Sequence, residues 1–150
     1  MWYDDVMETE YSFKGQGGKE KIYEEFANDI LKLPLKRQSH KLYDFVNLDN
    51  DQKVEFKKQC NQQWFDASKY YNLSDNDNDI VMHFLLINKN GNADKVYEIK
   101  TKTFIDTFFD KEYIRMCHEI SIKFPRHQNK IDFKILDLVI RPEFKLIWEN

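Results

Sequence analysis

The chain has 150 residues, of which 41% are hydrophobic, 15% aromatic and 33% charged. This composition is typical of one globular domain with a hydrophobic core and excludes an intrinsically disordered chain. The formal net charge of −3 indicates no overall basic surface. That counts against nucleic-acid binding, although basic strips and an acidic metal site can coexist on one protein.

The two cysteines, Cys60 and Cys117, match neither a paired zinc spacing nor a disulfide framework. We expect both to be free thiols in a reducing compartment. The start of the sequence is acidic and aromatic and lacks the basic and apolar regions of a signal peptide. No segment approaches the roughly 20 apolar residues of a membrane span. These features predict a soluble, intracellular protein with no membrane partner.

Helical and extended patterns alternate along the chain and are separated by turn residues. Pro34 ends the first helical pattern, and Asn90-Gly91 has the residues that a tight hairpin needs. In chain order, the expected elements are a helix over 19–33, strands over 42–48 and 53–57, a helix over 62–71, strands over 80–87 and 95–103, helices over 104–109 and 111–122, a strand or helix over 131–140, and a strand or tail over 144–148.

The segment 80–87 is apolar at nearly every position, so we expect its strand at the centre of the sheet, covered on both faces. Helices and strand pairs alternate around it. This order predicts a mixed α/β fold in which helices flank a central mixed β-sheet. No repeat or long linker divides the chain, so we expect one domain over 1–150.

Three polar residues of the first expected hairpin form the candidate site. If the turn pivots at Asp49-Asn50, Asp44 falls directly opposite Glu55 on the neighbouring strand. Because side chains alternate along a strand, Glu55 and Lys57 share one face. Two carboxylates within reach of one divalent cation, with an ammonium group beside them, suit metal-assisted hydrolysis of a phosphodiester.

The sequence Asp44, then Glu55-Phe56-Lys57, after a helix that carries acidic residues, resembles the PD-(D/E)xK nuclease superfamily. That group includes many type II restriction endonucleases, Holliday-junction resolvases and some homing endonucleases. The resemblance covers roughly residues 14–103 and implies a restriction-endonuclease-like fold. It implies that Asp44 and Glu55 are ligands of Mg²⁺, with Mn²⁺ as a substitute, and that Lys57 positions or activates the attacking water.

A carboxylate from the first helix often completes the site in this superfamily. Glu20 is favoured for that role because it follows the glycine-rich loop, and Glu24 is the alternative one turn later. The sequence departs from the pattern at one position, because Tyr43 stands where the motif has its proline.

A second copy of the Glu-x-Lys pattern lies at Glu98 and Lys100, with Asp79 upstream as its candidate aspartate. A two-residue turn at Asn90-Gly91 would place Glu98 opposite His83. Asp79 then lies beyond the end of the pairing and cannot face Glu98 without a slip or a bulge. The register therefore favours the first copy, although the second remains an alternative.

The resemblance implies a Mg²⁺-dependent DNA endonuclease of the sequence-specific restriction type, acting on double-stranded DNA. One active site in so small a chain predicts a homodimer or a higher symmetric assembly, since a double-strand cut usually needs two sites. A homing endonuclease, a junction resolvase and an RNA-directed nuclease remain open. The alternative from another class is a non-enzymatic interaction or inhibitor protein, whose acidic surface binds a basic partner.

Contacts with DNA would come from basic and amide side chains around the carboxylates. Lysine and arginine meet phosphates, and amide side chains bond adenine edges in the major groove. The candidate residues are Lys14, Lys58, Gln59, Asn61, Gln62, Gln63 and Arg126.

Overall fold

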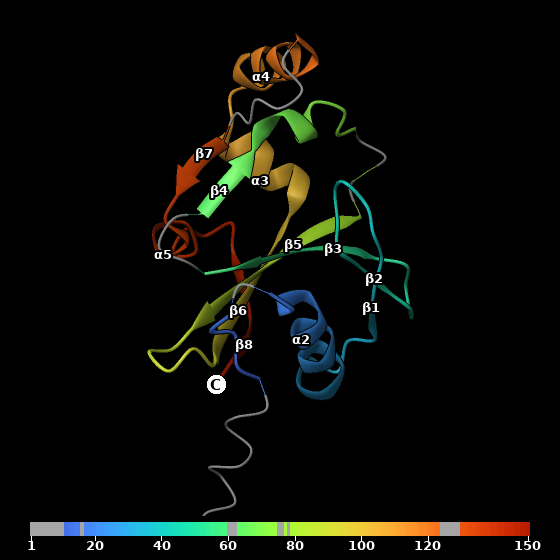
Figure 1. The fold of residues 1–150 in the computed structure, drawn as a ribbon, viewed down its shortest axis with the longest axis vertical. Helices are drawn as coiled ribbons and strands as arrows, with labels where there is room; N and C mark the ends of the chain where they lie inside the picture. Colours follow the sequence, from blue (N-terminus) through green and yellow to red (C-terminus); the bar gives the residue numbers. More distant parts are fainter. Residues whose placement is uncertain (1–10, 16, 60–62, 75–76, 78, 124–129) are drawn as a thin grey trace, which may run out of the picture.

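The structure is a computed structural model that describes residues 11–15, 17–59, 63–74, 77, 79–123 and 130–150. Its main feature is a six-stranded sheet in the order β1-β2-β3-β5-β6-β8 (Figure 1). The strands are β1 (Leu35–Arg37), β2 (Phe45–Asn47), β3 (Lys53–Lys58), β5 (Ile80–Ile87), β6 (Ala93–Lys100) and β8 (Lys145–Glu149). Neighbouring strands are antiparallel except β3 and β5, which are parallel. The predicted mixed α/β class with a mixed sheet is confirmed.

Helices cover both faces of this sheet, as the order of elements predicted. The helical elements are α2 (Lys19–Phe26), its π-helical continuation η1 (Ala27–Leu31), the 3₁₀ turn η2 (Ala67–Tyr70), α3 (Thr101–Phe108), α4 (Lys111–Lys123) and α5 (Ile135–Leu138). Figure 1 shows α2 on one side of the crossing strands β3 and β5, with α3 and α4 on the other. The first helix ends at Lys32, which has a left-handed backbone (φ 58°), two residues before Pro34.

The strand β5 is the centre of the sheet, as predicted, since it lies between β3 and β6. Its alternate side chains enter two hydrophobic clusters. Val81 and Leu85 pack with α2 and with the apolar residues of β3, on what we call the α2 face. Met82 and Phe84 pack with α3, α4 and α5, on the opposite or α3 face. Each residue of β3 therefore points to one of two differently covered faces.

The helix expected over 62–71 is wrong for most of its length. Residues Gln63–Asp66 form β4, which pairs antiparallel with β7 (Lys130–Phe133) in a separate two-stranded sheet, and only Ala67–Tyr70 are helical, as η2. The partner strand lies more than sixty residues away in the chain, so no local pattern reports this pairing.

The boundaries of the other helices and strands differ from the predicted ones at a few positions. The strand β6 ends at Lys100 rather than at 103, because Thr101 already opens α3. The break predicted near Asp110 is present between α3 and α4. The segment 131–140, expected as a strand or a helix, contains both, since β7 is followed by α5.

In the described part of the chain, no helix combines the length and the apolar composition that crossing a membrane requires. Cys117 is buried and forms no disulfide, as expected, whereas Cys60 lies outside the described residues.

Candidate active site

The register of the β2–β3 hairpin is the one that a pivot at Asp49-Asn50 predicts. Phe45 pairs with Val54, and Val46 pairs with Lys53. Asp44 lies one residue before β2, outside the paired residues, and an extension of the same register would place it opposite Glu55. Phe45 and Val54 point to the α2 face. Because directions alternate along a strand, Glu55 points to the α3 face. Asp44 precedes β2, and the charges of Glu55, Lys57 and Lys69 act on its carboxyl group.

The backbone and the side chain of Asp44 are both held by β3. Its amide donates to the carbonyl oxygen of Val54 at 2.9 Å, and its Oδ2 accepts a hydrogen bond of 2.7 Å from the amide of Phe56. The carboxylate of Asp44 thus takes the place of a backbone carbonyl as the acceptor for the Phe56 amide, where the backbone pairing of β2 with β3 ends. The other oxygen, Oδ1, has no hydrogen-bond partner among the described residues.

Glu55 is almost fully buried, with 2% of its surface exposed. Its Oε2 lies 2.5 Å from Lys69 Nζ and 3.5 Å from Lys57 Nζ. The hydroxyl of Tyr70 donates toward both carboxylate oxygens, at 3.2 Å each. We call Asp44, Glu55, Lys57 and Lys69 the carboxylate–lysine cluster. Its formal charges sum to zero when all four groups are ionised.

Burial and the nearest groups of opposite charge shift the pKa values in this cluster in opposite directions. Burial raises the pKa of Asp44. The amide of Phe56 lowers it, the charge of Glu55 raises it further, and the two lysines lower it. Burial lowers the pKa of Lys57, and the charge of Glu55 is the largest opposing effect. The arrangement holds charged groups where water solvates them poorly, which is common at functional sites.

Lys69 and Tyr70 are the site residues that sequence reasoning missed. Both belong to η2, in the connection that leads from β3 to the parallel strand β5. No spacing in the sequence relates Lys69 to Glu55, because the contact depends on how this connection crosses the α3 face.

The structure does not bring the carboxylates of the first helix to this cluster. Tyr23 of α2 stacks on Phe56 at a centroid distance of 4.2 Å, so the helix covers the α2 face, opposite Glu55. The Glu24 carboxylate instead accepts a hydrogen bond from the amide of Arg37, and Glu20 lies one turn earlier on the same helix. No group of three His, Cys, Asp or Glu side chains able to hold a metal ion occurs among the described residues.

Two of the expected DNA contacts are engaged within the protein. The ammonium of Lys58 is buried and donates to the carbonyl oxygens of Phe13 at 2.8 Å and Gly15 at 3.3 Å. These hydrogen bonds from Lys58 hold the segment before α2 against β3, and the ammonium does not face solvent. The side-chain oxygen of Gln59 accepts a hydrogen bond from the amide of Ile87 at 3.0 Å.

Lys14 is exposed, beside the turn at Gly91. The backbone of Gln63 lies in β4. The candidates outside the described residues are Asn61, Gln62 and Arg126.

The second Glu-x-Lys copy forms a different arrangement. Glu98 pairs with His83, as predicted, although the β5–β6 register shifts by one residue between Leu86 and Ile87, nearer the turn. The Oε2 of Glu98 lies 2.9 Å from His83 Nε2. The hydroxyl of Tyr23 lies 2.7 Å from the other ring nitrogen of His83. Asp79 is 3.9 Å from the ammonium of Lys53. The aspartate and the glutamate of this copy therefore do not converge, and His83 has a partner at each ring nitrogen.

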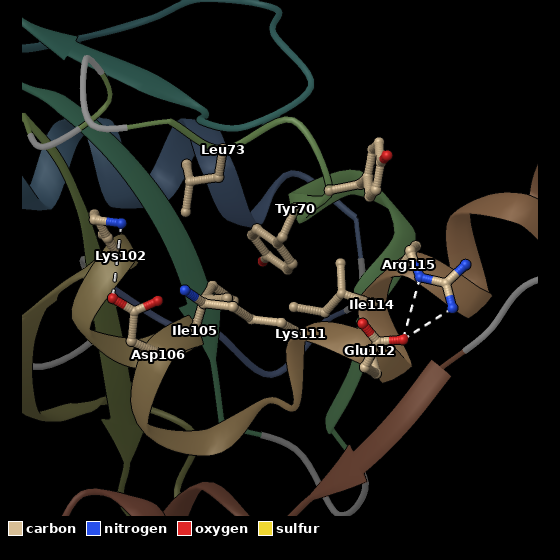
Figure 2. Close-up of a pocket in the computed structure, with 10 residues that line it drawn as sticks. Tyr70, Leu73, Lys102, Ile105, Asp106, Lys111, Glu112, Ile114 and Arg115 are labelled. Carbon is tan, nitrogen blue, oxygen red and sulfur yellow. Dashed lines mark hydrogen bonds and ion pairs between the residues drawn. The ribbon is translucent and has the colours of Figure 1, made fainter.

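A cavity of about 350 Å³ lies between η2, α3 and the start of α4 (Figure 2). Tyr70, Ile105 and Ile114 supply part of its apolar lining. Lys102 is 3.7 Å from Asp106 at its rim, and the Arg115 guanidinium pairs with Glu112 at 2.8 Å. Tyr70 thus borders this cavity with its ring while its hydroxyl contacts Glu55.

No family model, curated protein or solved structure matches this chain. The interpretation of the site therefore depends on the geometry of its own residues.

Proposed function

We propose that this protein is a Mg²⁺-dependent endonuclease that hydrolyses phosphodiester bonds in double-stranded DNA, of the sequence-specific restriction type. The juxtaposition of Asp44, Glu55 and Lys57 carries the proposal. One carboxylate is on β3 and the other is on the residue just before β2, and the Lys57 ammonium lies 3.5 Å from Glu55. Helix α2 before the hairpin and the parallel pairing of β3 with β5 support a restriction-endonuclease-like arrangement.

The donor groups fit a divalent cation in their chemistry. Asp44 keeps one carboxylate oxygen without a partner in the described part of the chain, and Glu55 lies beside it. Mg²⁺ prefers hard oxygen ligands, retains several waters and is commonly held by one or two carboxylates together with substrate phosphates. Asp44 and Glu55 would hold it. When bound there, Mg²⁺ would polarise the phosphate and lower the pKa of a coordinated water.

Lys57 supplies positive charge next to these carboxylates. Its ammonium is in position to donate hydrogen bonds to a non-bridging phosphate oxygen or to the attacking water. Negative charge grows on the phosphate oxygens during hydrolysis, and donors that are already oriented stabilise it without reorganisation. Burial of the surrounding side chains strengthens this interaction, because water screens it less.

The charge balance of the carboxylate–lysine cluster favours a second candidate function. Two lysines neutralise two carboxylates, and both oxygens of Glu55 already accept hydrogen bonds. Such a network is complete as a structural element. In that case the protein is a non-enzymatic module, and its net charge of −3 suits a basic partner.

Cleavage of supercoiled plasmid separates the two functions. The endonuclease nicks or linearises the plasmid in Mg²⁺ and leaves it intact in EDTA, and Glu55→Gln abolishes the reaction. Asp49→Asn is the matched control, because Asp49 is an exposed carboxylate in the turn of the same hairpin. Equal plasmid cleavage by the parent and by Glu55→Gln would remove the proposal. An inactive parent would favour the non-enzymatic module.

Cutting of both strands would require two copies of the site. We therefore propose a homodimer or a higher symmetric assembly on DNA. Linear product that forms together with nicked product supports this assembly, whereas nicked product alone indicates that one chain acts singly.

A further inference from the structure

We propose that Lys69 is a resident counter-ion of Glu55 that a divalent cation must displace, so that Lys69 sets the metal affinity of the site. This inference rests on the proposed function, because it concerns the same carboxylates. It assigns a positioning role to a residue of η2, which the motif in the hairpin does not include.

The distances identify Lys69 as the principal cation at Glu55. Its Nζ lies 2.5 Å from Oε2, whereas Lys57 Nζ lies 3.5 Å from the same atom. Tyr70, the next residue in η2, donates its hydroxyl toward the same carboxylate. With only 2% of Glu55 exposed, a cation that coordinates Oε2 must take the position that the Lys69 ammonium holds.

The surroundings of Lys69 allow that exchange. The Lys69 side chain is 20% exposed, so part of it already contacts solvent. Its ammonium also lies 5.0 Å from the centroid of the Tyr70 ring, which offers the ammonium a second favourable contact. The Tyr70 ring is part of the hydrophobic core and also lines the cavity of Figure 2.

Displacement reduces the observed metal affinity, because part of the binding energy is spent on separating Lys69 from Glu55. Removing the lysine charge should therefore strengthen metal binding. A purely structural ion pair predicts the opposite, since its loss would disorder the carboxylates and weaken any metal site.

Calorimetric titration of the full chain with Ca²⁺, without DNA, tests the inference. We expect Lys69→Met to lower the Kd for Ca²⁺ by about tenfold and Lys69→Gln to shift it in the same direction. Lys69→Arg, which keeps the charge, should bind Ca²⁺ as the parent does. Lys102→Met is the matched control, because Lys102 is a partly exposed lysine paired with Asp106 outside the cluster.

An unchanged or higher Kd in both neutral variants of Lys69, each folded by circular dichroism, would overturn the inference. Plasmid cleavage by the parent in Mg²⁺ would then leave the proposed function standing. If neither the parent nor the Lys69 variants bind Ca²⁺, the inference and the metal-dependent function are both wrong.

Discussion

The carboxylate of Asp44, the residue just before β2, accepts a hydrogen bond of 2.7 Å from the backbone amide of Phe56 in β3. A residue proposed as a metal ligand thus also satisfies the backbone of the neighbouring strand. The two roles use different atoms of one side chain, because the hydrogen bond occupies Oδ2. Stability and catalysis can therefore be separated at this position by choice of substitution.

Asp44→Asn should keep an oxygen acceptor for the Phe56 amide, whereas Asp44→Ala leaves that amide without its partner. We expect Asp44→Ala to be less stable than Asp44→Asn by about 1–2 kcal/mol. Both variants should lose cleavage, because neither has the carboxylate charge. Urea denaturation and plasmid assays measure the two effects. Equal stability of the variants would show that the hydrogen bond contributes little.

Glu55→Gln should destabilise the protein strongly, because it leaves the ammonium groups of Lys57 and Lys69 close together without their shared carboxylate. We expect a loss of about 2–4 kcal/mol in the free energy of unfolding. Glu112→Gln, which breaks an exposed pair with Arg115, should change stability by less than about 1 kcal/mol. Similar losses for the two variants would contradict the buried network.

Lys57→Ala should slow cleavage by about 10²–10³-fold while DNA binding in Ca²⁺ changes little, since Lys57 acts on charge that develops during hydrolysis. Single-turnover cleavage and a gel-shift titration separate these effects. Lys89→Ala is the control, because Lys89 is exposed in the β5–β6 turn. A parallel fall in DNA affinity and cleavage would make Lys57 a binding residue only.

The contact between Glu98 and His83 predicts how stability depends on pH. The hydrogen bond from His83 lowers the pKa of Glu98 below its ordinary value of 4.5, burial opposes this effect, and the charges of His83 and Lys145 add to it. A carboxyl group whose pKa is lower in the folded state stabilises the fold above its unfolded pKa. That contribution is lost as the pH falls through the folded pKa.

Glu98→Gln removes this contribution. The unfolding free energy of the parent should therefore fall more steeply below about pH 4.5 than that of Glu98→Gln. Glu149→Gln, which changes an exposed carboxylate on the adjacent strand β8, should follow the parent. Superimposable pH profiles of the parent and Glu98→Gln would contradict the role of the His83 hydrogen bond.

Sequence reasoning predicted what depends on short-range register. The polar turn at Asp49-Asn50 predicted the register of β2 with β3, and the turn at Asn90-Gly91 predicted the pairing of Glu98 with His83. The second pairing also includes a shift of one residue between Leu86 and Ile87, so a two-residue turn alone does not set it. The apolar run of β5 likewise indicated its central position in the sheet.

What sequence reasoning missed depends on contacts between distant segments. The strand β4 exists because β7 pairs with it, and Lys69 reaches Glu55 because η2 crosses the α3 face. The resemblance and the position of Glu20 after the glycine-rich loop pointed to Glu20 as a site residue, but neither shows which face of the sheet α2 covers. In the structure α2 packs on the face opposite Glu55.

A crystal structure of the protein soaked in Mn²⁺ tests the central claim most directly, because the ion is located by its anomalous signal. The account predicts a peak shared by the carboxylates of Asp44 and Glu55, with the Lys69 ammonium moved away from Oε2. A Glu55–Lys69 pair that stays intact at saturating Mn²⁺, with no peak at either carboxylate, would contradict it.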